Sequence, residues 1–110
     1  MAANKKNVYL FQPNFKIGEG KFVNYWMPYS VACIWSYASS FKHIRDAYDL
    51  KELFFRRENI EYLRGKIESP AVFGFSCYVW NWKYNLHTAR ELKRIFPKSL
   101  MIFGGPHVPE

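Results

Sequence analysis

The stretch that decides the fold is AVFGFSCYVWN, residues 71–81. It begins as an almost continuous apolar run, which is typical of a strand covered on both faces within a parallel sheet. Its end carries polar and aromatic side chains where a plain turn would be enough: Ser76, Cys77, Tyr78, Trp80 and Asn81. A second run, LMIFGGPHVPE at residues 100–110, has the same plan. We interpret both as strands whose carboxyl ends open onto one flat ligand site that accepts aromatic contacts.

The rest of the chain alternates between strand and helix patterns. Short apolar runs indicate strands at residues 8–11, 52–55, 71–76 and 100–103. Amphipathic helices are expected between them, one starting at Pro28, one capped by Asn59 and one ended by Pro97. Their expected inner faces are Val31, Ile34, Trp35, Ala38 and Phe41; Ile60, Leu63 and Ile67; and Leu86, Ala89, Leu92 and Phe96. This alternation predicts βαβ units, and hence an α/β fold with a parallel sheet flanked by helices.

Two features of the pattern stay open. Residues 46–55 also fit a helix, because Ala47, Leu50 and Phe54 recur at helical spacing. The sequence stops at Glu110, directly after the fourth expected strand, whereas a doubly wound sheet usually continues. We therefore expect the N-terminal piece of something larger, or a natural truncation.

The composition indicates one globular domain. Of the 110 residues, 49% are hydrophobic and 20% aromatic, which is too many for a disordered chain. No apolar run approaches the roughly 20 residues that a membrane-spanning helix needs. Residues 1–15 contain no apolar core of a signal peptide. We therefore expect a cytoplasmic protein without a membrane partner.

The formal charge of +7 raises the alternative of nucleic-acid binding, since Lys and Arg neutralise phosphates. The basic residues, however, are scattered along the chain. The densest group, Arg90, Lys93 and Arg94, falls on the outer face of a predicted helix, which is usually a solvated face. A basic domain that stacks nucleic-acid bases on exposed aromatic side chains therefore stays as the second hypothesis.

The cysteines and histidines form no metal-binding pattern. Cys33 and Cys77 belong to no closely spaced cluster, so we expect each to be a buried, reduced thiol. His43, His87 and His107 are too dispersed for a zinc site. We expect His87 to be exposed or to cap its helix, whereas His107, in the loop after the last strand, is a candidate for a functional role.

Several phosphate and redox chemistries are excluded because their motifs are missing. GEGKF, residues 18–22, begins like a dinucleotide fingerprint but lacks the third glycine. No P-loop sequence is present. The acidic residues of a response-regulator receiver are absent, since Gln12 and Ser76 stand in those neighbourhoods.

The candidate site lies where the predicted strands end. In open α/β sheets, ligands bind beyond the carboxyl ends of the strands, near the switch point. Gly104 and Gly105 permit positive φ and the close approach of a ligand to the backbone. Ser76 and Asn81 offer short hydrogen-bonding groups without charge. The alternative is that the glycines make a plain turn and that Asn81 caps a helix.

Four segments together resemble the cobalamin-binding domain at the N-terminus of B12-dependent radical SAM enzymes. They are NVYLFQPN, MPYSVACIWSYASSF, FRRENIEYLRGKIESPAVFGFSCYVWNWKYNLHTARELKRIFP and FGGPHVP, in that order along almost the whole of residues 1–110. The resemblance implies a Rossmann-like B12 fold, with the corrinoid across the strand ends and its nucleotide tail between strand and helix. The cofactor-binding positions that it implies are Gln12, Pro13, Asn14, Ser76, Cys77, Tyr78, Val79, Trp80, Asn81, Gly104, Gly105, Pro106 and His107.

Two departures from related sequences limit what this chain can do. Methionine-synthase-like B12 domains carry Asp-x-His-x-x-Gly after the first strand, and that histidine ligates cobalt. If Gly18 takes the place of the glycine, Pro13 and Phe15 take those of Asp and His, so no lower histidine ligand is expected. The CxxxCxxC motif that holds the iron–sulfur cluster of radical SAM enzymes is also absent.

The resemblance therefore implies a module that is not catalytic alone. It would present cobalamin to a radical SAM domain, in cis or in trans, and that domain would hold S-adenosylmethionine and a 4Fe-4S cluster. The expected parent is a methyltransferase-type enzyme. The alternatives are the basic nucleic-acid-binding α/β domain and a non-functional fragment.

Overall fold

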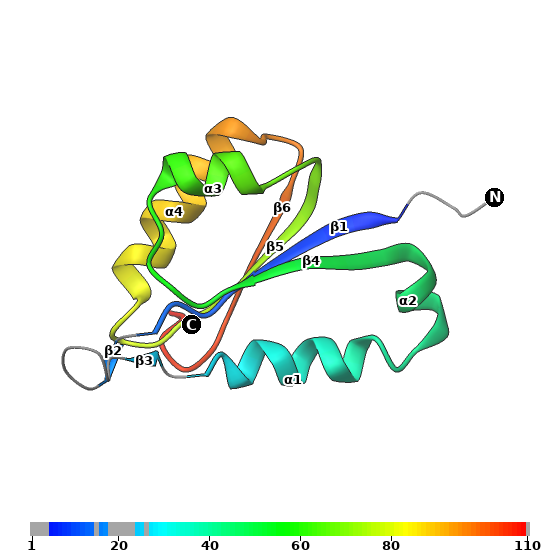
Figure 1. The fold of residues 1–110 in the computed structure, drawn as a ribbon, viewed down its shortest axis with the longest axis horizontal. Helices are drawn as coiled ribbons and strands as arrows, with labels where there is room; N and C mark the ends of the chain where they lie inside the picture. Colours follow the sequence, from blue (N-terminus) through cyan, green and yellow to red (C-terminus); the bar gives the residue numbers. More distant parts are fainter. Residues whose placement is uncertain (1–4, 15, 18–23, 26, 110) are drawn as a thin grey trace.

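The computed structural model describes residues 5–14, 16–17, 24–25 and 27–109 (Figure 1). Its elements follow in the order β1 (Lys6–Phe11), β2 (Lys16–Ile17), β3 (Asn24–Tyr25), α1 (Tyr29–Ala38), α2 (Lys42–Ala47), β4 (Tyr48–Phe54), α3 (Ile60–Lys66), β5 (Pro70–Ser76), α4 (Trp82–Ile95) and β6 (Leu100–Gly104). From β4 to β6 strands and helices alternate, as the sequence predicts, whereas two short strands and two helices separate β1 from β4.

A four-stranded sheet with the order β4-β1-β5-β6 forms the centre of the fold. All three of its strand pairings are parallel. From β1 the chain places β4 on one side and then β5 and β6 on the other, so the strand order reverses between β1 and β5. This is the switch point of a Rossmann-like α/β fold, and the predicted fold class is confirmed. A separate two-stranded antiparallel sheet, β2 and β3, lies within the first crossover.

Helices α3 and α4 cover one face of the sheet (Figure 1). Alternate strand residues point to this face, among them Tyr9, Phe11 and Phe73, each with 1% or less of its surface exposed. The rings of Phe11 and Phe75 stack with centroids 4.7 Å apart. Leu63 of α3 and Leu92 of α4 are fully buried against them. This aromatic layer is the larger of the two core clusters.

Helix α1 lies on the opposite face (Figure 1). Val8 and Leu10 of β1 meet Val31 of α1 in a second, smaller core cluster, with Trp35 packed against it. The sequence predicts a longer inner face for this helix, and that prediction is wrong at Ile34 and Phe41, which are 61% and 41% exposed. Phe41 is exposed because α1 ends at Ala38. Ile34 is exposed because it lines an open cavity and does not pack against the sheet.

Residues 46–55 form a strand for most of their length. Strand β4 pairs in parallel with β1, from Lys6 opposite Tyr48 to Phe11 opposite Phe54, with one register shift between Val8 and Tyr9. The helical alternative is wrong for this segment, because pairing with β1 places Leu50 and Phe54 in a ladder. The short helix α2 ends at Ala47, just before the strand begins.

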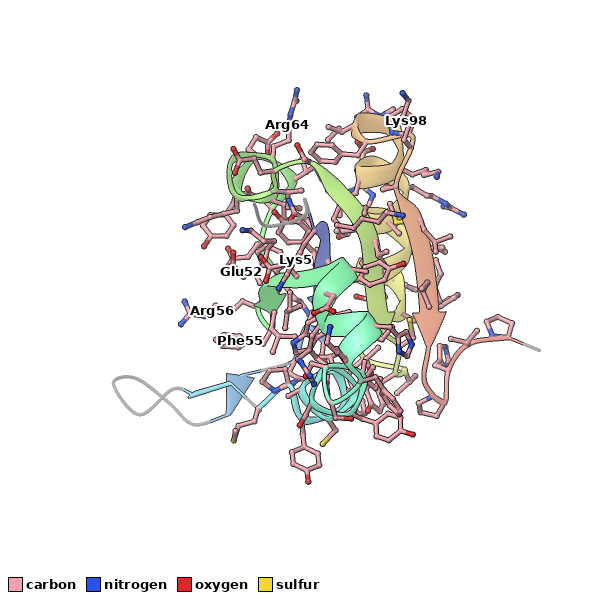
Figure 2. The ribbon with its side chains drawn as sticks, turned by 90° about the vertical axis from the view of Figure 1, so that its right-hand side faces the viewer. Lys5, Glu52, Phe55, Arg56, Arg64 and Lys98 are labelled. Atoms are coloured by element: carbon pink, nitrogen blue, oxygen red, sulfur yellow. The ribbon has the colours of Figure 1, made fainter. Side chains whose placement is uncertain are left out.

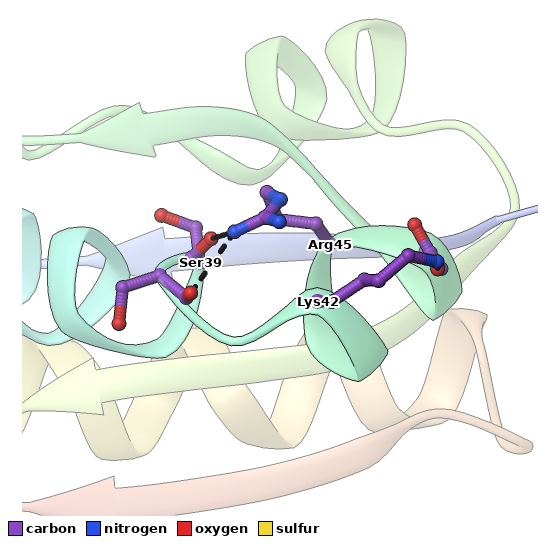
Figure 3. A network of polar contacts seen from close by, with 5 residues as sticks. Ser39, Lys42 and Arg45 are labelled. Atoms are coloured by element: carbon purple, nitrogen blue, oxygen red, sulfur yellow. Dashed lines mark hydrogen bonds and ion pairs between the residues drawn. The ribbon is translucent and has the colours of Figure 1, made fainter.

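Two of the helix ends confirm the predicted stop and start signals. The Asn59 side chain accepts a hydrogen bond from the backbone N–H of Tyr62, 2.8 Å away, at the start of α3. Helix α4 ends at Ile95, two residues before Pro97. At the end of α1, the Arg45 guanidinium donates to the carbonyls of Ser39 and Ser40 at 2.9 and 3.0 Å (Figure 3).

Basic side chains of the described residues are spread over the surface, and two of them, Arg56 and Arg57, follow β4 at its carboxyl end, where the Arg57 guanidinium donates to the Trp80 carbonyl. Arg64 and Lys98 point outward at the end of the molecule opposite the carboxyl ends of the strands, and Arg56 lies beside Phe55 near the edge strand β4 (Figure 2). Arg90, Lys93 and Arg94 are exposed on α4, as expected for a solvated face. No helix within the described ranges combines the length and apolar character that crossing a membrane requires.

Candidate functional site

The carboxyl ends of β1, β5 and β6 meet at one edge of the sheet, as the sequence predicts. The backbone N–H of Cys77 donates to the Gly104 carbonyl at 2.7 Å, and the His107 N–H donates to the Cys77 carbonyl at 3.2 Å. After β1, the N–H of Gln12 donates to the Phe54 carbonyl at 2.9 Å. Backbone hydrogen bonds therefore hold the strand-end segments beside one another.

Asn81 joins the segments that follow β1 and β5. Its side-chain N–H group donates to the carbonyls of Pro13 at 3.1 Å and Ser76 at 3.0 Å, and its Oδ1 accepts from the Tyr78 N–H at 2.8 Å. The residue is fully buried. Asn81 occupies the N-cap position of α4, but its side chain makes no capping hydrogen bond. Its side chain therefore shapes the loop from Ser76 to Asn81.

A second buried asparagine supports the same loop. Asn85 donates to the Ser76 carbonyl at 3.1 Å and lies 3.5 Å from the sulfur of Cys77. Burial raises the pKa of the Cys77 thiol, and the Asn85 amide lowers it by a smaller amount. Cys77 is buried, as predicted. Cys33 is exposed on α1, so the prediction of a buried thiol there is wrong; it lies two positions along the helix from Val31 and turns away from the sheet.

The two glycines at the end of β6 differ in what surrounds them. Gly105 has a φ of +109°, and a Cβ there would lie 2.5 Å from the carbonyl oxygen of Cys77. A side chain at this position is excluded by the protein's own backbone. A Cβ at Gly104 would have no atom within 4 Å. Open space therefore lies beside Gly104.

That open space belongs to a cavity of about 280 Å³ on the α1 side of the sheet, at the switch point. Its walls come from Leu10, Val72, Gly74 and Ile102 on the strands and from Val31 and Ile34 on α1. Ser76, Gly104 and Gly105 line it at the strand ends. These strand residues share one face because side chains alternate along a strand. Ile34 and Ile102 are 61% and 50% exposed, so the cavity is open to solvent between α1 and β6.

Two hydroxyl groups meet beside the cavity. The hydroxyls of Ser30, in the first turn of α1, and Tyr78 lie 2.7 Å apart and share a hydrogen bond. The Tyr78 ring stacks on Trp80 with centroids 4.6 Å apart and planes inclined by 4°. Val79, between them, is 72% exposed. The loop therefore presents a stacked aromatic pair and an exposed apolar tip at the edge of the sheet.

The other residues predicted to bind the cofactor do not line the cavity. The Gln12 side chain accepts from the Val31 N–H at 3.2 Å, and Asn14 is buried. His107 is exposed, with its ring 5.7 Å from that of Trp82, and it does not line the cavity. Pro106 is exposed beside it. Phe15 and residues 18–22, on which two sequence-based interpretations depend, lie outside the described residues.

Sequence reasoning missed the walls of the cavity, which come from mid-strand residues and α1. One signal could have found them. Gly74 interrupts an apolar strand, and a glycine inside a strand often marks the close approach of another group. A Cβ there would lie 2.7 Å from the Leu10 side chain. Among the described residues, no three His, Cys, Asp or Glu side chains are grouped to hold a metal ion.

The sheet order and the cavity at its switch point define a Rossmann-like α/β module with an apolar cavity beside the strand ends. No family model matches the chain. It is 33% identical over 84 residues to the cobalamin-dependent radical SAM methyltransferase TokK of Streptomyces tokunonensis. It is 32% identical over 84 residues to the 2-(S-pantetheinyl)-carbapenam-3-carboxylate methyltransferase of Streptantibioticus cattleyicolor. Each match covers 76% of this chain and 12% of the relative, so the chain corresponds to a small part of either protein.

Proposed function

We propose that this chain is the cobalamin-binding module of a B12-dependent, methyltransferase-type radical SAM protein. The observation that carries the proposal is the apolar cavity of about 280 Å³ that opens at the switch point of the sheet. Ligands of open α/β sheets bind at this place. The 33% identity to a cobalamin-dependent methyltransferase supports cobalamin as the ligand.

The dimensions of the cavity suit one part of cobalamin. Pockets for whole drug-sized ligands are about 300–1,000 Å³, so this cavity is too small for a corrin ring but suits a flat aromatic base. The base at the end of the nucleotide tail would lie between Val31 of α1 and Val72 of β5. Ser30, Ser76 and Tyr78 offer hydroxyl groups for the sugar and phosphate that precede it.

The corrin ring would then lie outside the cavity, over the strand ends. It is large, flat and partly apolar, and the exposed loop offers Val79 and Trp80 as contacts. Asn81 would contribute to cofactor binding indirectly, because its buried hydrogen bonds hold this loop in place. When bound, cobalamin supplies the methyl-transfer or cobalt redox chemistry, and the protein positions it.

The proposal includes a catalytic partner domain. A radical SAM domain in cis or in trans would hold S-adenosylmethionine and the 4Fe-4S cluster. This chain's cysteines, Cys33 and Cys77, are on α1 and after β5, and they cannot supply a CxxxCxxC motif. Presentation of the cofactor to that partner is the role proposed for residues 1–110.

Titration of the chain with hydroxocobalamin, followed by visible absorbance and equilibrium dialysis, tests this function. The variant Gly104→Val places a branched side chain in the open space beside the cavity and is expected to weaken binding at least about tenfold. Gly65→Val is the matched control, because a Cβ at Gly65, on α3, also has no atom within 4 Å. The control should bind like the parent chain. Absence of binding by the parent, or equal affinity of both variants, would overturn the proposal.

A further inference from the structure

The segment that contains α1 is the longest part of the sequence without a charged residue. Asp, Glu, Lys and Arg make up 23% of the 110 residues, but none occurs between Lys21 and Lys42. A helix on the surface of a globular domain usually carries charged side chains on its solvent face, and a helix without a polar face is normally buried. Helix α1 has apolar and small uncharged residues around its whole circumference. Its outer face is therefore suited to contact with protein.

The outer face of α1 carries a strip formed by Tyr29, Cys33 and Tyr37, which follow one another at helical spacing. Val31 packs against the sheet on the opposite side of the helix. The two tyrosines are 71% and 70% exposed, and Cys33 is exposed between them. Phe41 extends the strip, because its ring centroid lies 5.1 Å from that of Tyr37. Within the described residues, no helix or strand lies beyond α1 on this side of the molecule (Figure 1).

The sequence of α1 is nearly symmetric about Cys33. In YSVACIWSY, residues 29–37, both directions from this cysteine end in serine followed by tyrosine. Each tyrosine lies about 6 Å from Cys33 along the helix axis, at about 1.5 Å per residue. Two antiparallel copies of α1 that meet at Cys33 would therefore place Tyr29 of each copy opposite Tyr37 of the other. Such an interface is isologous, since one surface serves both copies.

We infer that the outer face of α1 is the contact surface of a homodimer, in which two copies of this chain pack antiparallel through Tyr29, Cys33 and Tyr37. A second copy fits this face because it supplies the same uncharged aromatic strip in the reverse direction. Ala32 and Ser36, which are small and exposed, allow the two helices to approach closely. Antiparallel packing also brings the opposite ends of the two helix dipoles together. The inference does not depend on the proposed ligand.

The exposed apolar area around α1 sets the strength of this contact. Between 41% and 77% of the surface is exposed at Met27, Tyr29, Ile34, Tyr37 and Phe41. At roughly 200 Å² for a large side chain, these residues expose on the order of 600 Å². Two such surfaces would bury about 1,200 Å², which is the lower limit for a specific protein interface. We therefore expect a dimer that dissociates in the micromolar range, and salt should strengthen it by screening the +7 charge of each copy.

Sedimentation equilibrium of the 110-residue chain, over concentrations that cross the micromolar range, tests the inference. The parent chain should change from monomer to dimer. Tyr29→Glu and Tyr37→Lys should each weaken association at least about tenfold, because each places a charge in an apolar contact. Both charges suit their end of the helix dipole, so the fold should be kept. Tyr62→Lys, at a 42% exposed tyrosine of α3, is the matched control and should dimerise like the parent.

The double variant Tyr29→Glu/Tyr37→Lys tests the antiparallel arrangement. It places opposite charges across the interface at both tyrosine contacts, so it should associate more tightly than either single variant. The labelling rate of Cys33 gives an independent measurement at the centre of the strip. A thiol reagent should label Cys33 rapidly in dilute solution and at least about threefold more slowly well above the dissociation constant. In Tyr37→Lys, labelling should stay rapid at both concentrations.

Three results would contradict the proposed dimer. A parent chain that stays monomeric, or that forms no defined dimer, would overturn the inference and favour another polypeptide as the occupant of this face. A dimer that neither single variant weakens would overturn it by placing the contact elsewhere. Equal weakening in the single and double variants would refute the antiparallel arrangement. Hydroxocobalamin binding is measured separately, so none of these results decides the proposed function.

Discussion

Replacing Asn81 with alanine would break the connection between the segments after β1 and β5. The Pro13 carbonyl and the Tyr78 N–H would lose the hydrogen bonds that they make to Asn81 at 3.1 and 2.8 Å. The Ser76 carbonyl would keep its bond from Asn85. Each buried group left unpaired costs about 1–3 kcal/mol. The free energy of unfolding should therefore fall by roughly 2–6 kcal/mol, which is a large part of the stability of a small domain.

Urea unfolding followed by circular dichroism and tryptophan fluorescence measures this loss. Asn59→Ala is the matched control: the same substitution at an exposed N-cap, where a loss of about 1 kcal/mol is expected. Asn81→Ala should be clearly less stable than Asn59→Ala. If both variants lose the same stability, the Asn81 hydrogen bonds contribute no more than a surface cap, and the role given to this residue is wrong.

Three further predictions concern the strand-end segments and the thiols. Gly105→Ala should lower the melting temperature by several degrees, because the added Cβ would meet the Cys77 backbone at a φ of +109°. Gly104→Ala should change the melting temperature little, and equal melting temperatures of the two variants would contradict the prediction. Cys33 should react rapidly with a thiol reagent in a dilute solution of the native chain, whereas Cys77 should react only on unfolding, because burial raises the pKa of the Cys77 thiol and restricts access to it. Rapid labelling of both cysteines in the native chain would refute this prediction. With the base off cobalt, as the proposed function implies, the paramagnetic resonance spectrum of bound cob(II)alamin should lack nitrogen superhyperfine splitting. The reason is that Phe15 takes the place of the ligating histidine if Gly18 takes that of the motif's glycine. Such splitting would show an axial nitrogen and refute this.

Much of the fold could be predicted because its two central strands, β1 and β5, are largely buried. Residues 8–11 and 71–76 are nearly continuous apolar runs, and both are strands of the central sheet. The boundary of β4 was harder to predict. It begins at Tyr48, where pairing with Lys6 of β1 begins, and a partner so distant in sequence leaves no local signal.

The candidate site could be predicted in outline and not in detail. Parallel strands bring their carboxyl ends to one edge, so the grouping of Ser76 and Gly104 follows from topology. The roles of Asn81 and Gly105 depend on atoms of distant backbone, which a sequence pattern does not specify. The exposure of Cys33 and Ile34 was missed because helical spacing alone does not show how much of α1 the sheet covers.

The central position of β1 matters while the chain is being synthesised. Phe11 of β1 pairs with Phe54 of β4 on one side and Phe75 of β5 on the other. Both partners leave the ribosome after it, and at about 5–20 residues per second the wait for the nearer one is roughly 2–9 seconds. During that interval the apolar segment VYLF, residues 8–11, has no strand to pair with. We expect it to be the part of the nascent chain most in need of a chaperone.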